Sequence, residues 1–184
     1  MARKKGARLV IDASVACAAG GESATADRAK KCRDLLVVVE ESPHRYYVVL
    51  TEEIIAEWNN NQSSFARGWR RRVLTAKKVC RVDPPAYNEL RDTIKKVAGK
   101  EKERTAMLED FLLIKAALAT DRIVISRDVR SRNPFAAASR ERGAGAMKTI
   151  AWLNPDSEDV AIWLTGGAVC EEKQLLDFLE EAAS

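Results

Sequence analysis

The stretch TAMLEDFLLIKAALATDRIVISRD spans residues 105–128 and joins the most apolar helical pattern of the chain to a short apolar strand. Its apolar residues recur at helical spacing over 105–120, and Ile123-Val124-Ile125 then predicts a strand that ends before Ser126-Arg127-Asp128. Such an uninterrupted apolar run is typical of a parallel sheet that helices cover on both faces. The stretch therefore predicts one helix–strand unit of an α/β fold.

Apolar runs and helical patterns alternate over the rest of the chain. Strands are predicted at residues 8–11, 46–50, 79–82, 123–125 and 149–153. Helices are predicted at 24–41, from 52 onward, at 64–76, 90–97 and 105–120, with amphipathic segments around Trp163 and over 175–179. Residues 100–104 are predicted to be a polar connection, and residues 129–147 a mobile loop in which a short helix is left open.

This order of elements predicts a three-layer α/β sandwich, in which helices flank a central parallel, twisted sheet of four to five strands. We find no internal repeat or linker, so we expect one domain over residues 1–184, with 155–184 as a C-terminal helical extension. Right-handed crossovers leave the carboxyl ends of all strands at one edge of such a sheet, which is where these folds bind ligands.

Composition narrows the class of protein and the kind of metal site. The chain has 184 residues, of which 46% are hydrophobic and 32% charged, as in ordinary soluble domains. Its longest apolar stretch, 111–119, is too short to span a bilayer, and no apolar signal region is evident, so we expect a cytoplasmic protein with no membrane partner. Four scattered cysteines and a single histidine, His44 in a predicted exposed turn, offer no zinc pattern. Any bound metal would therefore have oxygen ligands.

Two of the predicted strands run into an aspartate at this binding edge. Asp12 follows the first strand directly, and Asp128 follows Ile123-Val124-Ile125 after two residues. Either residue alone is better explained as a turn former or helix cap, but two at one edge favour a functional site.

Asp110 lies inside the apolar pattern of 105–120, on the same stripe as Leu113, Ile114 and Ala117. An ionised carboxylate buried without a partner costs several kcal/mol, so it requires a cation, a metal or strong hydrogen bonds. For Asp110 a functional role is favoured over a structural one.

A predicted helix that begins after Thr51 supplies further acids. Glu52 and Glu53 are explained by its N-terminus, where negative charge is favourable. Glu57 lies one turn further in, where that explanation fails, so Glu57 is the candidate and Glu53 a second choice.

Four converging carboxylates repel one another unless a hard divalent cation binds them, which indicates Mg²⁺ or Mn²⁺. Such a site can activate water for attack on a phosphodiester. Two clusters of basic residues would hold the remaining polyanion, and the candidate RNA-binding residues are Arg67, Arg70, Arg71, Arg127, Arg130 and Arg132.

With these residues in place, the chain resembles the PIN-domain nucleases. Residues 9–15, LVIDASV, resemble the opening strand of that family with its first catalytic aspartate, and residues 51–58, TEEIIAEW, resemble the second motif, whose glutamate falls on Glu57. Asp110 with the apolar residues after it resembles the third motif, and residues 123–128, IVISRD, resemble the fourth.

The resemblance implies a PIN fold and Mg²⁺- or Mn²⁺-dependent hydrolysis of RNA, most commonly single-stranded RNA. It also implies that Ser14 and Ser126 support the acids and, by similarity to toxin-type members, a homodimer and an antitoxin or other protein partner. The chain departs from the family in having no acid soon after Asp128, which leaves the number of metal ions open.

Two other classes of function remain open. The first is an RNA- or protein-binding module that keeps the fold without turnover, which the arginine-rich segments favour. The second is a phosphotransfer domain with Asp12 as the phosphorylated group. Phosphatases of that kind carry a second aspartate two residues later, where this chain has Ser14.

Overall fold

The structure is a computed structural model that describes residues 6–21, 25–42 and 45–178, so the predictions for His44 and Leu179 lie outside the described residues. Within these ranges five strands form one parallel sheet in the order β3-β2-β1-β4-β5. The strands are β1 (Ala7–Ile11), β2 (Tyr46–Leu50), β3 (Val79–Arg81), β4 (Ile123–Ile125) and β5 (Ala151–Leu153). The prediction of a parallel α/β sheet is confirmed.

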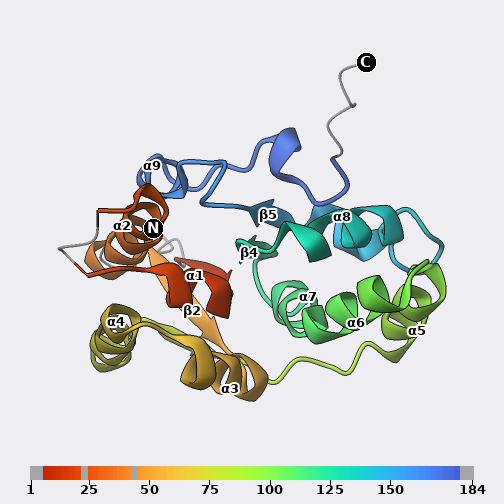
Figure 1. Cartoon of the computed structure of the whole chain (residues 1–184), viewed down its shortest axis with the longest axis horizontal. Coiled ribbons are helices and arrows are strands. Elements are labelled where there is room, and N and C mark those ends of the chain that lie inside the picture. The colour runs from red at the N-terminus through yellow and green to blue at the C-terminus, as the bar shows by residue number, and fades with distance from the viewer. Residues whose placement is uncertain (1–5, 22–24, 43–44, 179–184) are drawn as a thin grey trace, which may run out of the picture.

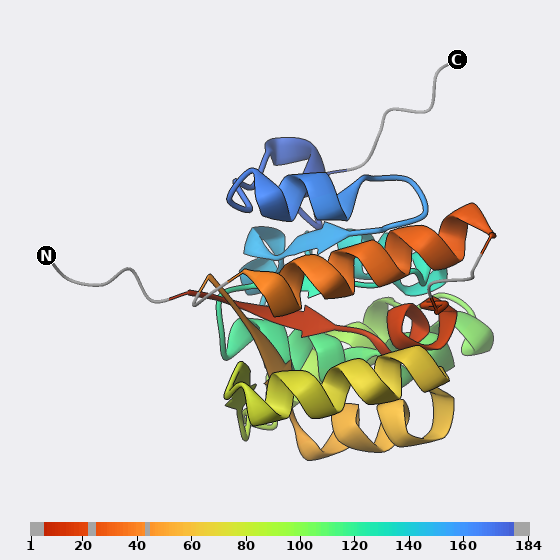
Figure 2. The same ribbon diagram turned by 90° about the vertical axis from the view of Figure 1, so that its left-hand side faces the viewer.

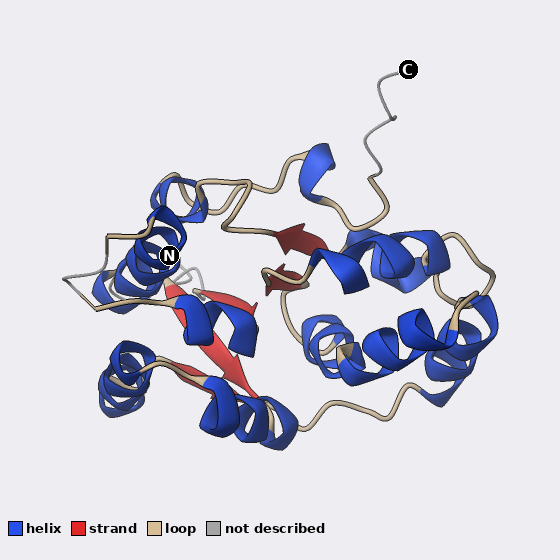
Figure 3. Ribbon diagram, viewed as in Figure 1, coloured by secondary structure: helices blue, strands red, loops and turns tan. Residues whose placement is uncertain are grey.

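Helices cover both faces of this sheet. They are α1 (Ala13–Ala18), α2 (Asp27–Glu41), α3 (Glu52–Asn61), α4 (Ser64–Thr75), α5 (Asn88–Val97), α6 (Glu101–Glu109), α7 (Phe111–Leu118), α8 (Val129–Ala138) and α9 (Val160–Thr165), with 3₁₀ turns at Gly145–Thr149 and Glu172–Gln174. Figure 1 shows α9, α2 and α4 on one side of the strands and α7, α6, α5 and α8 on the other. Figure 3 shows the same arrangement by type of element, with the strands as the middle layer, and Figure 2 turns it to the side that α2 and α4 cover.

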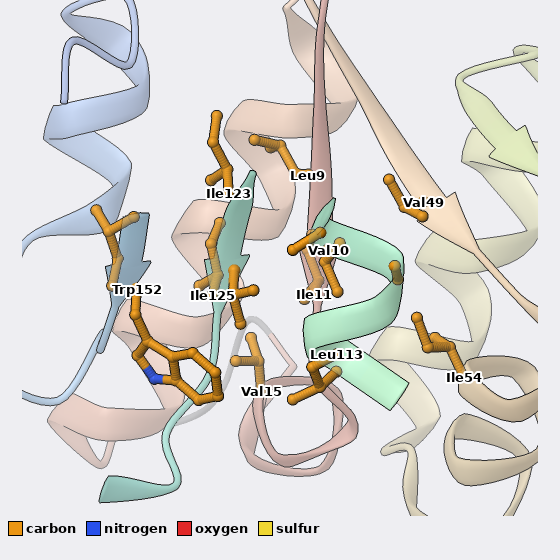
Figure 4. Packing of buried hydrophobic residues seen from close by; sticks show 14 of the residues in the cluster. Leu9, Val10, Ile11, Val15, Val49, Ile54, Leu113, Ile123, Ile125 and Trp152 are labelled. Atoms are coloured by element: carbon orange, nitrogen blue, oxygen red, sulfur yellow. The ribbon is translucent and has the colours of Figure 1, made fainter. Parts of the chain in front are cut away.

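The core lies on both faces of β1, where Leu9, Val10 and Ile11 are completely buried. Leu113 of α7 packs against β1 and β4 from one face of the sheet, as Figure 4 shows. Ala116 and Ala117 are also fully buried, and their small side chains let α7 lie close to β1 and β4. This packing fixes the start of α7 near the carboxyl ends of both strands.

The predicted helix over 105–120 is wrong in one respect, because it is broken at Asp110. α6 ends there and α7 begins one residue later, while Asp110 has φ −82° and ψ −1°. Its backbone carbonyl accepts from Leu113 N–H (3.0 Å) to start the second helix. The apolar spacing continues across the break, so the sequence pattern does not reveal it. Residues 101–104, predicted as a connection, are the first turn of α6, where Arg104 pairs with Glu101.

The prediction of a mobile loop over 129–147 is wrong for residues 129–138, because these ten residues form α8, which is the short helix that the prediction left open. The carboxylate of Asp128 accepts from the backbone N–H of Arg130 (2.8 Å) and caps this helix. Of the predicted amphipathic segment 175–179, residues 175–178 are described and are not helical. Leu175 instead forms an antiparallel bridge with Ala151 of β5.

In the described part of the chain, no helix has both the length and the apolar character that crossing a bilayer requires.

Candidate active site

Three aspartates lie near one another at the carboxyl edge of the sheet, and each comes from a different part of the chain. Asp12 follows β1 and Asp128 follows β4, and these two strands are paired in parallel. The backbone N–H of Asp12 donates to the carbonyl of Ile125 (3.0 Å), which extends this pairing to the first aspartate. Asp110 joins them from the α6–α7 junction, because α7 packs against both strands. The charges of Asp12 and Asp128 act directly on the Asp110 carboxyl.

The Asp12 carboxylate is half-buried and is oriented by two hydroxyl groups. The Oγ atoms of Ser14 and Ser126 both donate to its Oδ2, the second over 2.7 Å. Ser14 lies at the start of α1, and Ser126 directly follows β4. Oγ of Ser126 also accepts from the backbone N–H of Asp128 (3.1 Å), so this serine connects the two strand-end aspartates.

Of the three carboxylates, that of Asp110 has the fewest compensating contacts. Its Oδ2 is buried and has no hydrogen-bond partner among the described residues, and the same is true of Oγ of Ser131 on α8. Burial raises the pKa of Asp110 to about 6, and the negative charges of Asp12, Asp128 and Glu109 act in the same direction. The Ser131 hydroxyl is close enough to lower this pKa, although the two groups do not have hydrogen-bonding geometry. The position therefore favours a proton or a cation beside Asp110.

Asp128 already has a cationic partner. Both of its oxygens accept from the guanidinium of Arg130, Oδ1 from Nε over 3.1 Å and Oδ2 from Nη2 over 2.6 Å. These hydrogen bonds lower the pKa of Asp128. The Arg130 side chain is 82% exposed and Asp128 only 19%, so the arginine covers the aspartate from the solvent side.

The two candidate glutamates on α3 lie outside this cluster. Glu57 is exposed, and its carboxylate contacts Nδ2 of Asn61 (3.4 Å) rather than the aspartates. Glu53 forms an ion pair with Lys115 of α7 (2.8 and 2.9 Å). The structure brings three of the predicted acids together and does not bring Glu57 to them.

The side chains of the three aspartates are not arranged as a preformed metal site. Among the described residues, no three Asp, Glu, His or Cys side chains are grouped so that they could hold one. A shallow, open hollow of about 270 Å³ lies beside Asp128, and it is lined by Ser14, Arg127, Asp128, Val129 and Arg130 but not by Asp12 or Asp110. A larger hollow of about 610 Å³ lies at the ends of β2 and β3, beside the Glu53–Lys115 pair rather than over the aspartates.

The first arginine cluster lies on α4, whose other face packs through Trp69 and Val73. Arg67 and Arg71 are exposed, and no hydrogen bond or ion pair engages their guanidinium groups within the described residues. Arg70 differs, because it is half-buried and its Nη2 donates to Oδ1 of Asn59 (2.8 Å).

In the second arginine cluster, two of the three candidate side chains are partly buried and form contacts within the protein. Arg127 is largely buried and binds the carboxylate of Asp156, which follows β5. Arg132 is half-buried and its Nη2 lies 3.4 Å from the carbonyl oxygen of Lys173. Of the three predicted RNA-binding arginines in this cluster, only Arg130 is exposed.

Two residues of this region were not predicted from the sequence. Asp156 gave the same signal as Asp12 and Asp128, an acid after an apolar strand, and that signal could have identified it. Ser131 was missed because its segment was predicted to be a loop, whereas in α8 it is fully buried beside Asp110.

Comparison with protein-family models gives no match, and comparison with curated proteins gives none either. The resemblance to PIN-domain nucleases stays a prediction that rests on the motifs themselves.

Proposed function

We propose that this chain is a divalent-metal-dependent ribonuclease that hydrolyses phosphodiester bonds, with Asp12, Asp110 and Asp128 as its catalytic carboxylates. One observation carries the proposal. Oδ2 of Asp110 is buried without a hydrogen-bond partner, and the carboxyl group repels two further aspartates at a strand-end edge. An uncompensated carboxylate destabilises the fold, so its retention is explained best by a ligand of opposite charge.

The chemistry of the donor atoms suits a hard cation, although the three carboxylates are not grouped around one and would have to move toward a bound ion. The available atoms are carboxylate oxygens with the Ser131 hydroxyl beside them, and oxygen ligands suit Mg²⁺ or Mn²⁺. Asp12, Asp110 and Asp128 would hold the ion, while Glu57 and Glu53 remain candidates only through a change of side-chain conformation. When bound, such an ion neutralises the carboxylates and supplies activated water for attack on phosphorus.

The protein's own groups then prepare the site for a phosphate chain. Ser14 and Ser126 hold Asp12 in one orientation, which fixes the direction of one ligand oxygen. Arg130 pairs with Asp128 but is mostly exposed, so its guanidinium is placed to pair with a phosphate as well. Arg67 and Arg71 offer two further exposed cations on α4 for single-stranded RNA.

The test is cleavage of end-labelled single-stranded and duplex RNA in Mg²⁺, Mn²⁺ or excess EDTA. The variants Asp12→Asn and Asp110→Asn should lose activity. Asp83→Asn is the matched control, because Asp83 also follows a strand at this edge but is exposed and has no partner among the described residues.

Metal-dependent cleavage that both site variants lose and the control keeps would support the proposal. RNA that is bound but remains intact in both metals would instead identify a binding module. Cleavage that survives EDTA or Asp12→Asn would exclude a carboxylate–metal mechanism. If RNA is neither bound nor cut, phosphate transfer to Asp12 becomes the activity to assay.

A further inference from the structure

We propose that Asp156 and Arg127 form a positioning pair for the nuclease site, in which the chain after β5 orients Ser14 and, through it, Asp12. The inference rests on the proposed function, because it concerns the geometry of the same carboxylates. It also gives the residues that follow the sheet a role in the site.

The first step is the ion pair itself. Nε of Arg127 donates to Oδ1 and Oδ2 of Asp156 (3.1 and 3.2 Å), and Nη2 donates to Oδ2 (3.1 Å). The side chains are only 18% and 28% exposed, so solvent screens the pair little. Arg28 of α2 approaches Asp156 from outside, with Nε 3.4 Å from Oδ1. Several hydrogen bonds to one carboxylate fix the plane of the Arg127 guanidinium.

The second step leads from Arg127 to the first catalytic aspartate. The backbone N–H of Arg127 donates to Oγ of Ser14 (3.1 Å), and its Nη1 lies 3.4 Å from the carbonyl oxygen of Ser14. Because Oγ of Ser14 accepts from Arg127, its own proton is directed to Oδ2 of Asp12. Arg127 thus holds both the backbone and the hydroxyl of the residue that orients Asp12.

The third step fixes Asp156. Its backbone N–H donates to Oδ1 of Asn154 (2.9 Å), and the backbone N–H of Asn154 donates to Glu158 (3.2 Å). Glu158 in turn accepts from Nε2 of Gln174 (3.2 Å), a buried residue of the C-terminal segment. The segment after β5 is therefore connected by consecutive hydrogen bonds to the carboxyl edge of β1.

Burial of Arg127 distinguishes this role from RNA binding. A phosphate-binding arginine needs a guanidinium that solvent and ligand can reach, as that of Arg130 is, whereas the Arg127 side chain is only 18% exposed and is bound by Asp156 and Ser14. Outer partners of metal-binding carboxylates change metal affinity or activity by roughly 10- to 100-fold when they are removed. A simple structural ion pair would change stability and leave both quantities unaltered.

The experiment compares Asp156→Asn and Arg127→Lys with wild type. Asp121→Asn is the matched control, because it weakens another Arg–Asp pair, to Arg8, at the amino end of the sheet. For each protein the thermal midpoint, the Mn²⁺ dissociation constant by calorimetry, and kcat and KM for a single-stranded RNA are measured.

We expect both pair variants to weaken Mn²⁺ binding and to lower kcat by roughly tenfold or more, with KM changed less than about threefold. The control should lower the thermal midpoint and leave Mn²⁺ binding and kcat at wild-type values. Arg127→Lys decides the question if Asp156→Asn does not fold.

Wild-type Mn²⁺ affinity and kcat in both pair variants would overturn the inference, and so would a raised KM with unchanged kcat, which would make Arg127 an RNA-binding residue. In either case wild-type cleavage would leave the proposed function standing. If wild-type protein itself neither binds Mn²⁺ nor cleaves RNA, the proposed function fails and the positioning role fails with it.

Discussion

Asp110→Asn replaces a charged group by a neutral one of the same size at the most strained electrostatic position of the site. The pKa of Asp110 is about 6, against an ordinary value of 3.8, so the native state disfavours the ionised form by about two pKa units. Since one unit corresponds to about 1.4 kcal/mol, ionised Asp110 costs the metal-free fold up to about 3 kcal/mol near pH 7.5. Partial solvent access to the carboxyl reduces this figure, so we expect the variant to gain about 1–3 kcal/mol in free energy of unfolding.

The pH dependence has a definite sign. Native Asp110 takes up a proton near pH 6, whereas in the unfolded chain it does so only near pH 3.8. As the pH falls from about 7 to about 4, the native state binds the proton that the unfolded state does not, and the stability of the wild type rises relative to the variant. The advantage of Asp110→Asn should therefore be largest above pH 7 and vanish below about pH 4.

Urea denaturation of both proteins in EDTA at pH 7.5, 6.0 and 4.5 measures this difference. Added Mg²⁺ should then stabilise the wild type and leave the variant nearly unchanged, because the ion binds the native carboxylates. A variant that is less stable than wild type at pH 7.5, or an advantage that is the same at all three pH values, would refute the buried-charge argument.

Three further predictions concern the basic residues Lys78, Arg67 with Arg71, and Arg130. Lys78→Met should lower the free energy of unfolding by roughly 1.5–3 kcal/mol in urea denaturation, because the buried Lys78 ammonium donates to three backbone carbonyls at the end of α2. The double variant Arg67→Ala/Arg71→Ala should reduce the slope of log RNA affinity against log salt by about 1.4, as expected for two lost contacts to single-stranded RNA; an unchanged slope would place the RNA elsewhere. Arg130→Ala should tighten Mn²⁺ binding in calorimetry while weakening RNA binding, since Arg130 competes for Asp128; weaker binding of both would contradict that competition.

The parts of the site that could be predicted from sequence are those that local pattern determines. Asp12 and Asp128 each end an apolar run, and a parallel sheet brings such ends to one edge whatever the details of packing. The apolar stripe around Asp110 likewise predicted burial: Leu113 and Ile114 are buried in the core, whereas the Asp110 side chain is only partly buried, with Oδ2 enclosed.

The parts that could not be predicted depend on geometry that the pattern does not contain. A single-residue break at Asp110 leaves the helical periodicity intact, yet it places Asp110 at the junction between α6 and α7. Arg127 and Asp156 are 29 positions apart, so only the pairing of β4 with β5 brings them together. The sequence analysis grouped Arg127 with the RNA-binding arginines, because no feature of the neighbouring sequence indicates that its guanidinium is buried.

Lys78, which is buried, and Asp110, which has one enclosed carboxylate oxygen, show how the same fold treats two charges differently. The ammonium of Lys78 is surrounded by carbonyl oxygens of Val39, Glu40 and Ser42, so its burial is compensated within the protein. Oδ2 of Asp110 has no such partner in the described structure, and the charges of Asp12, Asp128 and Glu109 raise the pKa of its carboxyl further. A chain that satisfies one buried charge completely has the means to satisfy another, for instance with an asparagine at position 110. That it leaves the carboxylate uncompensated, next to two more, is the physical reason to look for the missing positive charge in a ligand.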